Sequence, residues 1–201
     1  MFYDAVENAH GLKHDPFKAL VAPRPIGWIS SISADGVANL APYSFFNAVN
    51  DRPHIVMFSS TGVKDSVVNI DATGEFVCNL ATFDLKDEMN TSSAAYGSQV
   101  DEFEASGLET APSKMVRPPR VKRAPAALEC RHLETKRLTD LNGVPLQGHV
   151  VFGQVVGIHI DDSLVSDGLV DITRARPIAR LGYMDYAVVN EVFAMPRPPQ
   201  P

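Results

Sequence analysis

Hydroxyl side chains, a glycine and a lysine cluster in the segment Ser59–Ser66, which reads SSTGVKDS. A short helical pattern follows over Ser66–Thr73, with Asp65 or Ser66 placed to cap it and Gly74 placed just past its end. Free N–H groups and the dipole at a helix N-terminus favour an anion, and a neighbouring lysine adds positive charge. The segment therefore predicts a phosphate site, although taken alone it is explained more simply by an ordinary capped surface helix.

Motifs for metals, triphosphates and acyl transfer are missing from the sequence. Six histidines and two cysteines give no C-x-x-C and no H-E-x-x-H, and the H-x-x-x-H pair of His10 and His14 lies in an irregular N-terminal segment. G-x-S-x-G, G-x-x-x-x-G-K and G-x-G-x-x-G are also absent. We therefore predict no metal. The motifs that usually indicate a hydrolase, a nucleoside triphosphatase or a dinucleotide-binding fold are missing. A polar pocket beside aromatic residues and an anion site suits a ligand with a flat apolar body and an anionic tail.

Length and composition are those of an ordinary globular protein. The chain has 201 residues, of which 45% are hydrophobic and 21% charged, and we expect one domain over residues 1–201. Its formal charge of -6 argues against nucleic acid as a partner. The sequence shows no secretory signal, and its longest apolar run is shorter than the roughly 18 to 20 residues that cross a bilayer. We expect a cytoplasmic protein without a membrane segment, in which Cys78 and Cys130 are small buried residues rather than a disulfide.

The elements that must position these residues are mainly short strands. Ile26–Ser33 alternates apolar and hydroxyl side chains, and Asp35-Gly36 then predicts a hairpin, because both residues tolerate positive φ. Further strands are expected over His54–Ser59, Glu75–Ala81, Ala127–Arg137 and His149–Ile160. Gly153 and Gly157 would mark bends in the last of these, as a small barrel requires. The succession of short strands and tight turns predicts an antiparallel barrel.

The remaining segments are less regular. Residues 1–19 are expected to form an N-terminal arm, and 194–201 a flexible proline-rich tail. Thr82–Gly107 has a helical pattern broken by Gly97, which suggests helices packed over one end of the barrel. Ala111–Pro125 combines four prolines with five cations. This loop is either a lid or arm that meets an anionic cofactor or a partner subunit, or a solvated basic loop.

Five stretches of the chain resemble the flavin reductase-like family, whose members have the FMN-binding split-barrel fold. These stretches are Pro23–Ser31 (PRPIGWISS), Asn39–Asn47 (NLAPYSFFN), Ser59–Ser66, Thr73–Leu80 (TGEFVCNL) and Ile178–Tyr186 (IARLGYMDY). They occur in order and with plausible spacing from Ala22 to Tyr186. The resemblance is specific for fold and flavin and much less so for the reaction.

The resemblance implies a mainly β Greek-key barrel with a few short helices, forming a homodimer that holds flavin near the subunit boundary. It implies that the flavin's ring, its edge, its phosphate and the rim of the site are each contacted by a group of residues. For the ring these are Trp28, Ser30 and Ser31; for its edge, Ser44, Phe45, Phe46 and Asn47; for the phosphate, Ser59, Ser60, Thr61, Lys64, Asp65 and Ser66; and for the rim, Arg180 and Tyr183. Core packing explains Trp28, Phe45 and Phe46 equally well when each is taken singly. Ser66 stands where the family often has threonine, and it keeps the hydroxyl.

The leading hypothesis for function is an NAD(P)H-dependent flavin reductase that uses FMN, with FAD as an alternative. One form of this hypothesis is the reductase partner of a two-component monooxygenase. A second hypothesis is an FMN-binding electron-transfer protein that does not use NAD(P)H, and a third is a non-redox β-barrel binding protein. We assign no catalytic acid or base, since hydride transfer from nicotinamide to flavin is cofactor chemistry.

Overall fold

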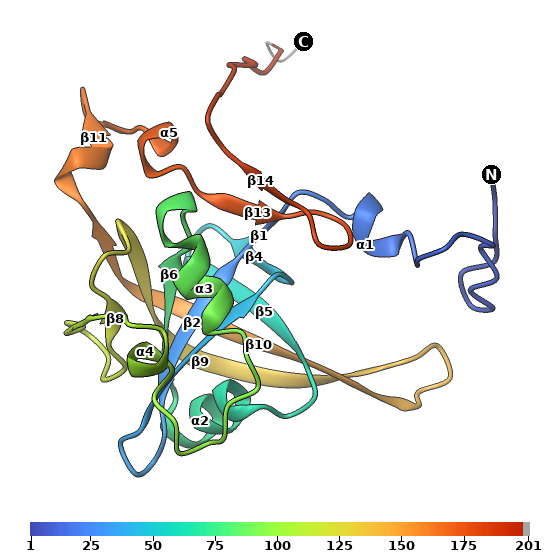
Figure 1. Cartoon of the computed structure of the whole chain (residues 1–201), viewed down its shortest axis with the longest axis horizontal. Helices are drawn as coiled ribbons and strands as arrows, with labels where there is room; N and C mark the ends of the chain where they lie inside the picture. Colours follow the sequence, from blue (N-terminus) through green and yellow to red (C-terminus); the bar gives the residue numbers. More distant parts are fainter. Residues whose placement is uncertain (199–201) are drawn as a thin grey trace.

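A computed structural model of the chain describes residues 1–198 and shows one curled antiparallel sheet as its centre (Figure 1). The sheet has seven strands in the order β3-β2-β6-β9-β10-β5-β4, which confirms the predicted mainly β class. The bounds of these strands are Gly27–Ile32 (β2), Ala38–Tyr43 (β3), Phe46–Asn50 (β4), Ile55–Thr61 (β5), Glu75–Leu80 (β6), Ala126–Thr139 (β9) and Pro145–Ile160 (β10).

Shorter strands and helices surround this sheet. A three-stranded sheet joins strands from the two ends of the chain: Arg24–Pro25 (β1), Ile178–Arg180 (β13) and Tyr186–Val188 (β14). Two small ribbons pair Thr110–Ala111 (β7) with Arg120–Val121 (β8), and Val165–Ser166 (β11) with Leu169–Val170 (β12). The helices are Phe17–Leu20 (α1), Asp65–Thr73 (α2), Lys86–Thr91 (α3), Glu102–Ala105 (α4) and Ile172–Ala175 (α5), with 3-10 turns at Phe83–Leu85 (η1) and Asp162–Leu164 (η2).

Alternation along β2 separates two buried cores. Trp28 packs into a cluster under η1, α3 and α4, whereas the next residue, Ile29, packs into a cluster inside the sheet with Phe58 and Phe76. The expected hairpin from β2 to β3 is confirmed, and Gly36 takes a φ of +90° within it. A buried strand with cores on both faces holds the neighbouring polar residues in fixed positions.

The hairpin of β9 and β10 bends beside its glycines, as the sequence predicted. The register between the two strands shifts at Phe152/Gly153 and at Val155/Gly157. A Cβ at Gly153 would collide with the ring of Phe76, so only glycine lets this ring approach the strand so closely. Figure 1 shows the far end of the hairpin projecting well beyond the rest of the sheet.

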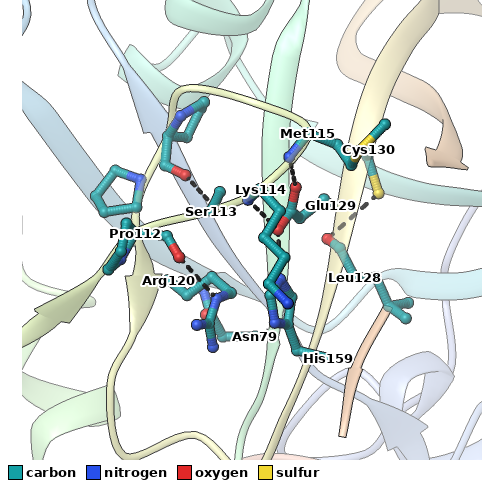
Figure 2. Close-up of polar contacts among 12 residues, drawn as sticks. Asn79, Pro112, Ser113, Lys114, Met115, Arg120, Leu128, Glu129, Cys130 and His159 are labelled. Carbon is teal, nitrogen blue, oxygen red and sulfur yellow. Dashed lines mark hydrogen bonds and ion pairs between the residues drawn. The ribbon is translucent and has the colours of Figure 1, made fainter. Parts of the chain in front are cut away.

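The loop Ala111–Pro125 is fastened to the outer face of the sheet. The buried carboxylate of Glu129 accepts hydrogen bonds from the backbone N–H groups of Lys114 (2.8 Å) and Met115 (2.5 Å) (Figure 2). At the loop surface, Arg117 pairs with Glu75 at 3.0 Å, and Arg123 pairs with a glutamate of α3 at 2.8 Å. Three of the five cations of this loop, Arg117, Lys122 and Arg123, form ion pairs with carboxylates. These contacts hold the loop in place, and its role as a lid or arm toward a cofactor or a partner subunit stays a prediction.

The helices between Thr82 and Gly107 are shorter than the sequence predicted. The pattern over Thr82–Gly107 gives only η1, α3 and α4, and residues 92–101 between the last two are irregular. The predicted cap of α2 was also wrong, because Lys64 is the N-cap residue and, among residues 1–198, no side chain caps the helix. Gly74 ends α2 in the left-handed conformation, as expected.

The termini carry little regular structure. Residues 1–16 form only turns and bends before α1, and residues 189–198 follow β14 without a helix or strand. Part of the expected tail, residues 199–201, lies outside the described residues. Cys78 and Cys130 are free and buried, in keeping with the sequence reading. In the described part of the chain, no helix is long and apolar enough to span a membrane, and no group of three His, Cys, Asp or Glu side chains is placed to hold a metal.

Candidate functional site

A cavity of about 450 Å³ opens between β3, β5, the N-terminus of α2 and the irregular segment that follows α3. This volume lies within the usual range of small-molecule sites, roughly 300 to 1,000 Å³. Its lining is rich in hydroxyl groups and carries charge of both signs. The lining residues are Lys18, Asn39, Ala41, Pro42, Tyr43, Ser44, Phe45, Ser59, Thr61, Lys64, Asp65, Ser66, Ser92–Tyr96 and Glu102.

The N-terminus of α2 forms one end of the cavity. The N–H groups of Val67 and Val68 turn back to the carbonyl of Lys64, at 2.9 and 3.0 Å. The N–H groups of Asp65 and Ser66 come before these two, so the helix offers them no carbonyl to bond. Lys64 brings a cation to the same end of the cavity. Since α2 has nine residues, its dipole and free N–H groups make this end suited to an anion.

A buried amide network fixes Ser66 at this end. Asn39 on β3 donates to Ser66 Oγ at 2.9 Å and more weakly to Ser31 Oγ at 3.4 Å. Asn69 on α2 donates to the same Ser31 oxygen at 3.3 Å. Because Ser66 Oγ accepts from Asn39, its own hydroxyl proton can point into the cavity. The network thus sets the direction in which Ser66 can donate.

Tyr43 presents an unsatisfied hydroxyl to the cavity. Its side chain is packed against Phe58, with ring centroids 4.6 Å apart, and burial raises the pKa of its phenol. Ser60 and Ser66 lie beside Tyr43 Oη, but within residues 1–198 this buried oxygen makes no hydrogen bond of acceptable geometry. An unsatisfied buried hydroxyl costs about 1 to 3 kcal/mol, so a bound ligand that pairs with it would be favoured.

Glu102 adds a buried carboxyl to the inner wall. One of its oxygens accepts the N–H of Leu40 at 3.0 Å, on the free edge of β3, and its side chain is buried. Burial raises the pKa of Glu102, although the Leu40 N–H lowers it in part. The lining therefore sets two cations, Lys18 and Lys64, against two acids, Asp65 and Glu102.

The irregular segment after α3 forms the roof and is held by Trp28. The indole N–H of Trp28 donates to Ser92 Oγ at 2.9 Å, and Ser92 Oγ in turn donates to the carbonyl of Met89 at 2.9 Å. These bonds fix the start of the roof, and Asp101 caps α4 at its end through the N–H of Phe103. Hydroxyls and a glycine between these anchors account for the absence of a continuous helix.

The structure brings together about half of the residues that the family resemblance selected. Seven of the residues expected to contact the ring edge or the phosphate line the cavity: Ser44, Phe45, Ser59, Thr61, Lys64, Asp65 and Ser66. Contacts between these residues and a flavin stay a prediction.

The other selected residues lie outside the lining. Trp28, Ser30 and Ser31 are fully buried behind it, and Ser30 faces the opposite way, donating to the carbonyl of Pro119 at 2.6 Å. Within the chain, Trp28 is a core residue, which agrees with the interpretation of Trp28 as a core-packing side chain. On β4, Phe46 packs inside the sheet against Gly27, and the Asn47 side-chain oxygen accepts the N–H of Ala48. On β5, the Ser60 hydroxyl donates to the carbonyl of Gly62. In the C-terminal segment, Arg180 donates to the carbonyl of Tyr183 and lies over the ring of Tyr186.

The sequence did not predict eleven of the eighteen lining residues, among them the whole segment Ser92–Tyr96. Asn39 and Tyr43 belong to the resembling stretch on β3, and alternation from Asn39 through Ala41 to Tyr43 would have placed them on one face. Lys18 and Glu102 come from short helices far away in sequence. No local pattern pointed to them.

The donor set of the cavity fits a flavin phosphate. An anion end with a lysine and free N–H groups adjoins an unsatisfied phenol, small hydroxyl residues and the Phe45 side chain. These are the features expected for a flat ligand with polar edges and an anionic tail.

Comparison with known proteins gives the family. The family described as flavin reductase like domain matches residues 20–179. An uncharacterised protein of Aquifex aeolicus is 39% identical over 169 residues, which cover 81% of this chain and 83% of that protein. The crystal structure of nitrilotriacetate monooxygenase component B from Bacillus cereus is 28% identical with a TM-score of 0.83, covering 92% of this chain and 95% of that one.

A second solved structure agrees in fold alone. The 2-nitrobenzoate 2-nitroreductase of Pseudomonas fluorescens is 24% identical with a TM-score of 0.85, covering 98% of this chain and 96% of that one. The chain also has the fold of a Shewanella frigidimarina protein described as a flavin reductase with a split barrel domain, at a TM-score of 0.83 and 21% identity, over 98% of this chain and 100% of that one. With the match over residues 20–179, the chain belongs to the flavin reductase-like family and has its split-barrel fold.

Proposed function

We propose that this protein is an NAD(P)H-dependent flavin reductase that binds FMN in the cavity described above. The observation that carries the proposal is the convergence, at one end of a single cavity, of the uncapped N-terminus of α2, Lys64 and the Ser66 hydroxyl. Family membership supports a flavin as the ligand, and the anion-binding end of the cavity favours FMN, which has a phosphate, over riboflavin, which has none.

In this proposal the chain's own residues bind and orient. Lys64 and the N–H groups of Asp65 and Ser66 hold the phosphate, and Tyr43 donates its otherwise unsatisfied hydroxyl to the ligand. Ser44 and Phe45 border the flavin ring, while the segment Ser92–Tyr96 covers the cavity and shields the ring from water. The bound flavin supplies the redox chemistry, accepting hydride from the nicotinamide. No side chain is assigned as a general acid or base.

We further propose a homodimer. Apolar side chains stand fully or half exposed on the projecting β9–β10 hairpin, among them Leu141 (97% exposed) and Val144 (54%). Such side chains on an extended ribbon are typical of a surface that a second subunit covers. The likeness to a monooxygenase component B supports a further proposal, that reduced flavin is passed to a separate oxygenase component.

Two measurements test the function. The absorbance spectrum of the purified protein, as isolated and after addition of FMN, should show bound flavin; no binding would overturn every redox role. Anaerobic mixing of the flavin-loaded protein with NADH or NADPH should bleach the flavin absorbance at a catalytic rate. Bound flavin that neither nucleotide reduces would instead favour a carrier of electrons between proteins.

A further inference from the structure

Three cations gather where the two ends of the chain meet beside the cavity. Arg24 and Arg180 are paired residues of β1 and β13, and Lys18 lines the cavity from α1. Within residues 1–198, none of the three lies within 4 Å of a carboxylate. The nearby Asp15 instead accepts the N–H of Phe17 at 2.8 Å. In a chain of net charge -6, this is a local excess of positive charge.

The short helix α1 is clamped in place. The buried guanidinium of Arg24 donates to the carbonyls of Lys18 and Val21, and also to the carbonyl of Leu181 at 2.8 Å. The turn after β13 lies so close that a Cβ at Gly182 would collide with Ala19. These contacts fix the backbone that carries Lys18, so its position at the cavity is built into the fold.

The clamp also brings the backbone of Lys18 close to Phe45, because Arg24 contacts both. The Arg24 guanidinium lies 5.7 Å from the centroid of the Phe45 ring, and Phe45 lines the cavity together with Lys18. If the phosphate binds at α2, as the proposed function has it, the ring end of the ligand lies toward Phe45. Burial lowers the pKa of Arg24, with a further contribution from the charge of Arg180, which again indicates positive potential there.

We propose that Lys18 stabilises the negative charge of the reduced flavin ring and so sets the reduction potential of the bound cofactor. This inference rests on the proposed function, since it requires flavin in this cavity. The measured couple takes up two electrons and one proton, which leaves one negative charge on the ring. A cation facing that charge favours the reduced form over the neutral oxidised ring.

The test is a spectroelectrochemical titration of FMN bound to the full-length protein and to three variants. Lys18→Met removes the charge and keeps much of the length, Lys18→Arg keeps the charge, and Lys13→Met removes a cation of the same arm that does not line the cavity. Affinity for oxidised FMN and thermal unfolding are measured in parallel, because they report phosphate binding and folding separately from the potential.

We expect Lys18→Met to weaken binding of reduced FMN about tenfold relative to oxidised FMN, which for a two-electron couple lowers the midpoint potential by about 30 mV. Lys18→Arg and Lys13→Met should leave the potential close to that of the wild type. An unchanged potential in Lys18→Met would overturn the inference, and an unchanged potential together with equal losses of affinity for oxidised and reduced FMN would assign Lys18 to the phosphate. Failure of the wild-type protein to bind FMN would instead refute the proposed function.

Discussion

Glu129 on β9 and His159 on β10 are joined across neighbouring strands by a hydrogen bond between the Glu129 carboxylate and His159 Nε2, with Glu129 fully buried (Figure 2). The same carboxylate receives the two consecutive N–H groups of Lys114 and Met115. A buried charge is tolerated only when it is paired and hydrogen-bonded, and here the partners come from another strand and from the loop. Glu129 therefore joins the loop Ala111–Pro125 to the sheet.

Glu129→Gln should destabilise the protein by about 1 to 3 kcal/mol, measured by urea unfolding. The amide group keeps the shape but has only one acceptor oxygen, so a backbone N–H of the loop loses its partner. Glu109→Gln serves as the control, because its ion pair with Lys122 is exposed and exposed pairs contribute about 0 to 1 kcal/mol. Equal, small effects of both changes would show that the loop does not depend on Glu129.

The contribution of Glu129 should also depend on pH. Burial alone would raise the pKa of Glu129, but hydrogen bonds from His159, Lys114 and Met115 outweigh it and lower the pKa below the usual glutamate value, about 4.3. A lowered folded-state pKa stabilises the fold above the unfolded-state value, and this stability is lost as pH falls through the folded-state value. The difference in unfolding free energy between wild type and Glu129→Gln should therefore be constant near neutral pH and shrink below about pH 4. A difference that grows on acidification would contradict this assignment.

Lys64→Glu should weaken FMN much more than riboflavin. Lys64 stands at the N-terminus of α2, so the reversed charge opposes the phosphate and leaves a ligand without phosphate largely unaffected. We expect a loss of at least about tenfold for FMN, or 1.4 kcal/mol, in fluorescence titrations. Equal losses for both ligands would place Lys64 elsewhere on the ligand.

Tyr43→Phe should act in opposite directions on stability and on binding. Without flavin, the variant should be as stable as the wild type or more stable, because a buried hydroxyl without a partner is removed. Its affinity for FMN should fall by roughly fivefold to tenfold, the contribution of about one hydrogen bond. Tyr3→Phe, in the N-terminal arm and outside the cavity lining, is the control. A less stable Tyr43→Phe protein with unchanged FMN affinity would show that the hydroxyl serves the fold.

Regular alternation and turn chemistry made most of the sheet predictable. The strand beginning at Ile26, the turn at Gly36 and the bends at Gly153 and Gly157 follow from side-chain period and backbone freedom, which are local properties. The α2 cap was not predictable, because Lys64 has N-cap geometry without a capping side chain.

The cavity was only half predictable for a different reason. Residues on α2 and β3 reach it through one continuous stretch, but Lys18 and Glu102 reach it through tertiary contacts, namely the Arg24 clamp and the Leu40 N–H. Conversely, Trp28 reads like a site residue because of its neighbours in sequence, yet it lies one layer deeper and acts on the roof through Ser92. Sequence proximity to a site does not distinguish its lining from the layer behind.

The proposed dimer can be tested on the projecting hairpin. If a second subunit covers Leu141, exposed here to 97%, then Leu141→Asp buries a charge and should raise the dimer dissociation constant at least about tenfold. Leu169→Asp, on the β11–β12 hairpin and 73% exposed, changes the same residue type on another projecting ribbon and should leave the mass unchanged. Analytical ultracentrifugation of both variants and of the wild type, with FMN present, measures the effect. A monomeric wild type that binds FMN would refute the dimer, because each chain would then complete its flavin site alone.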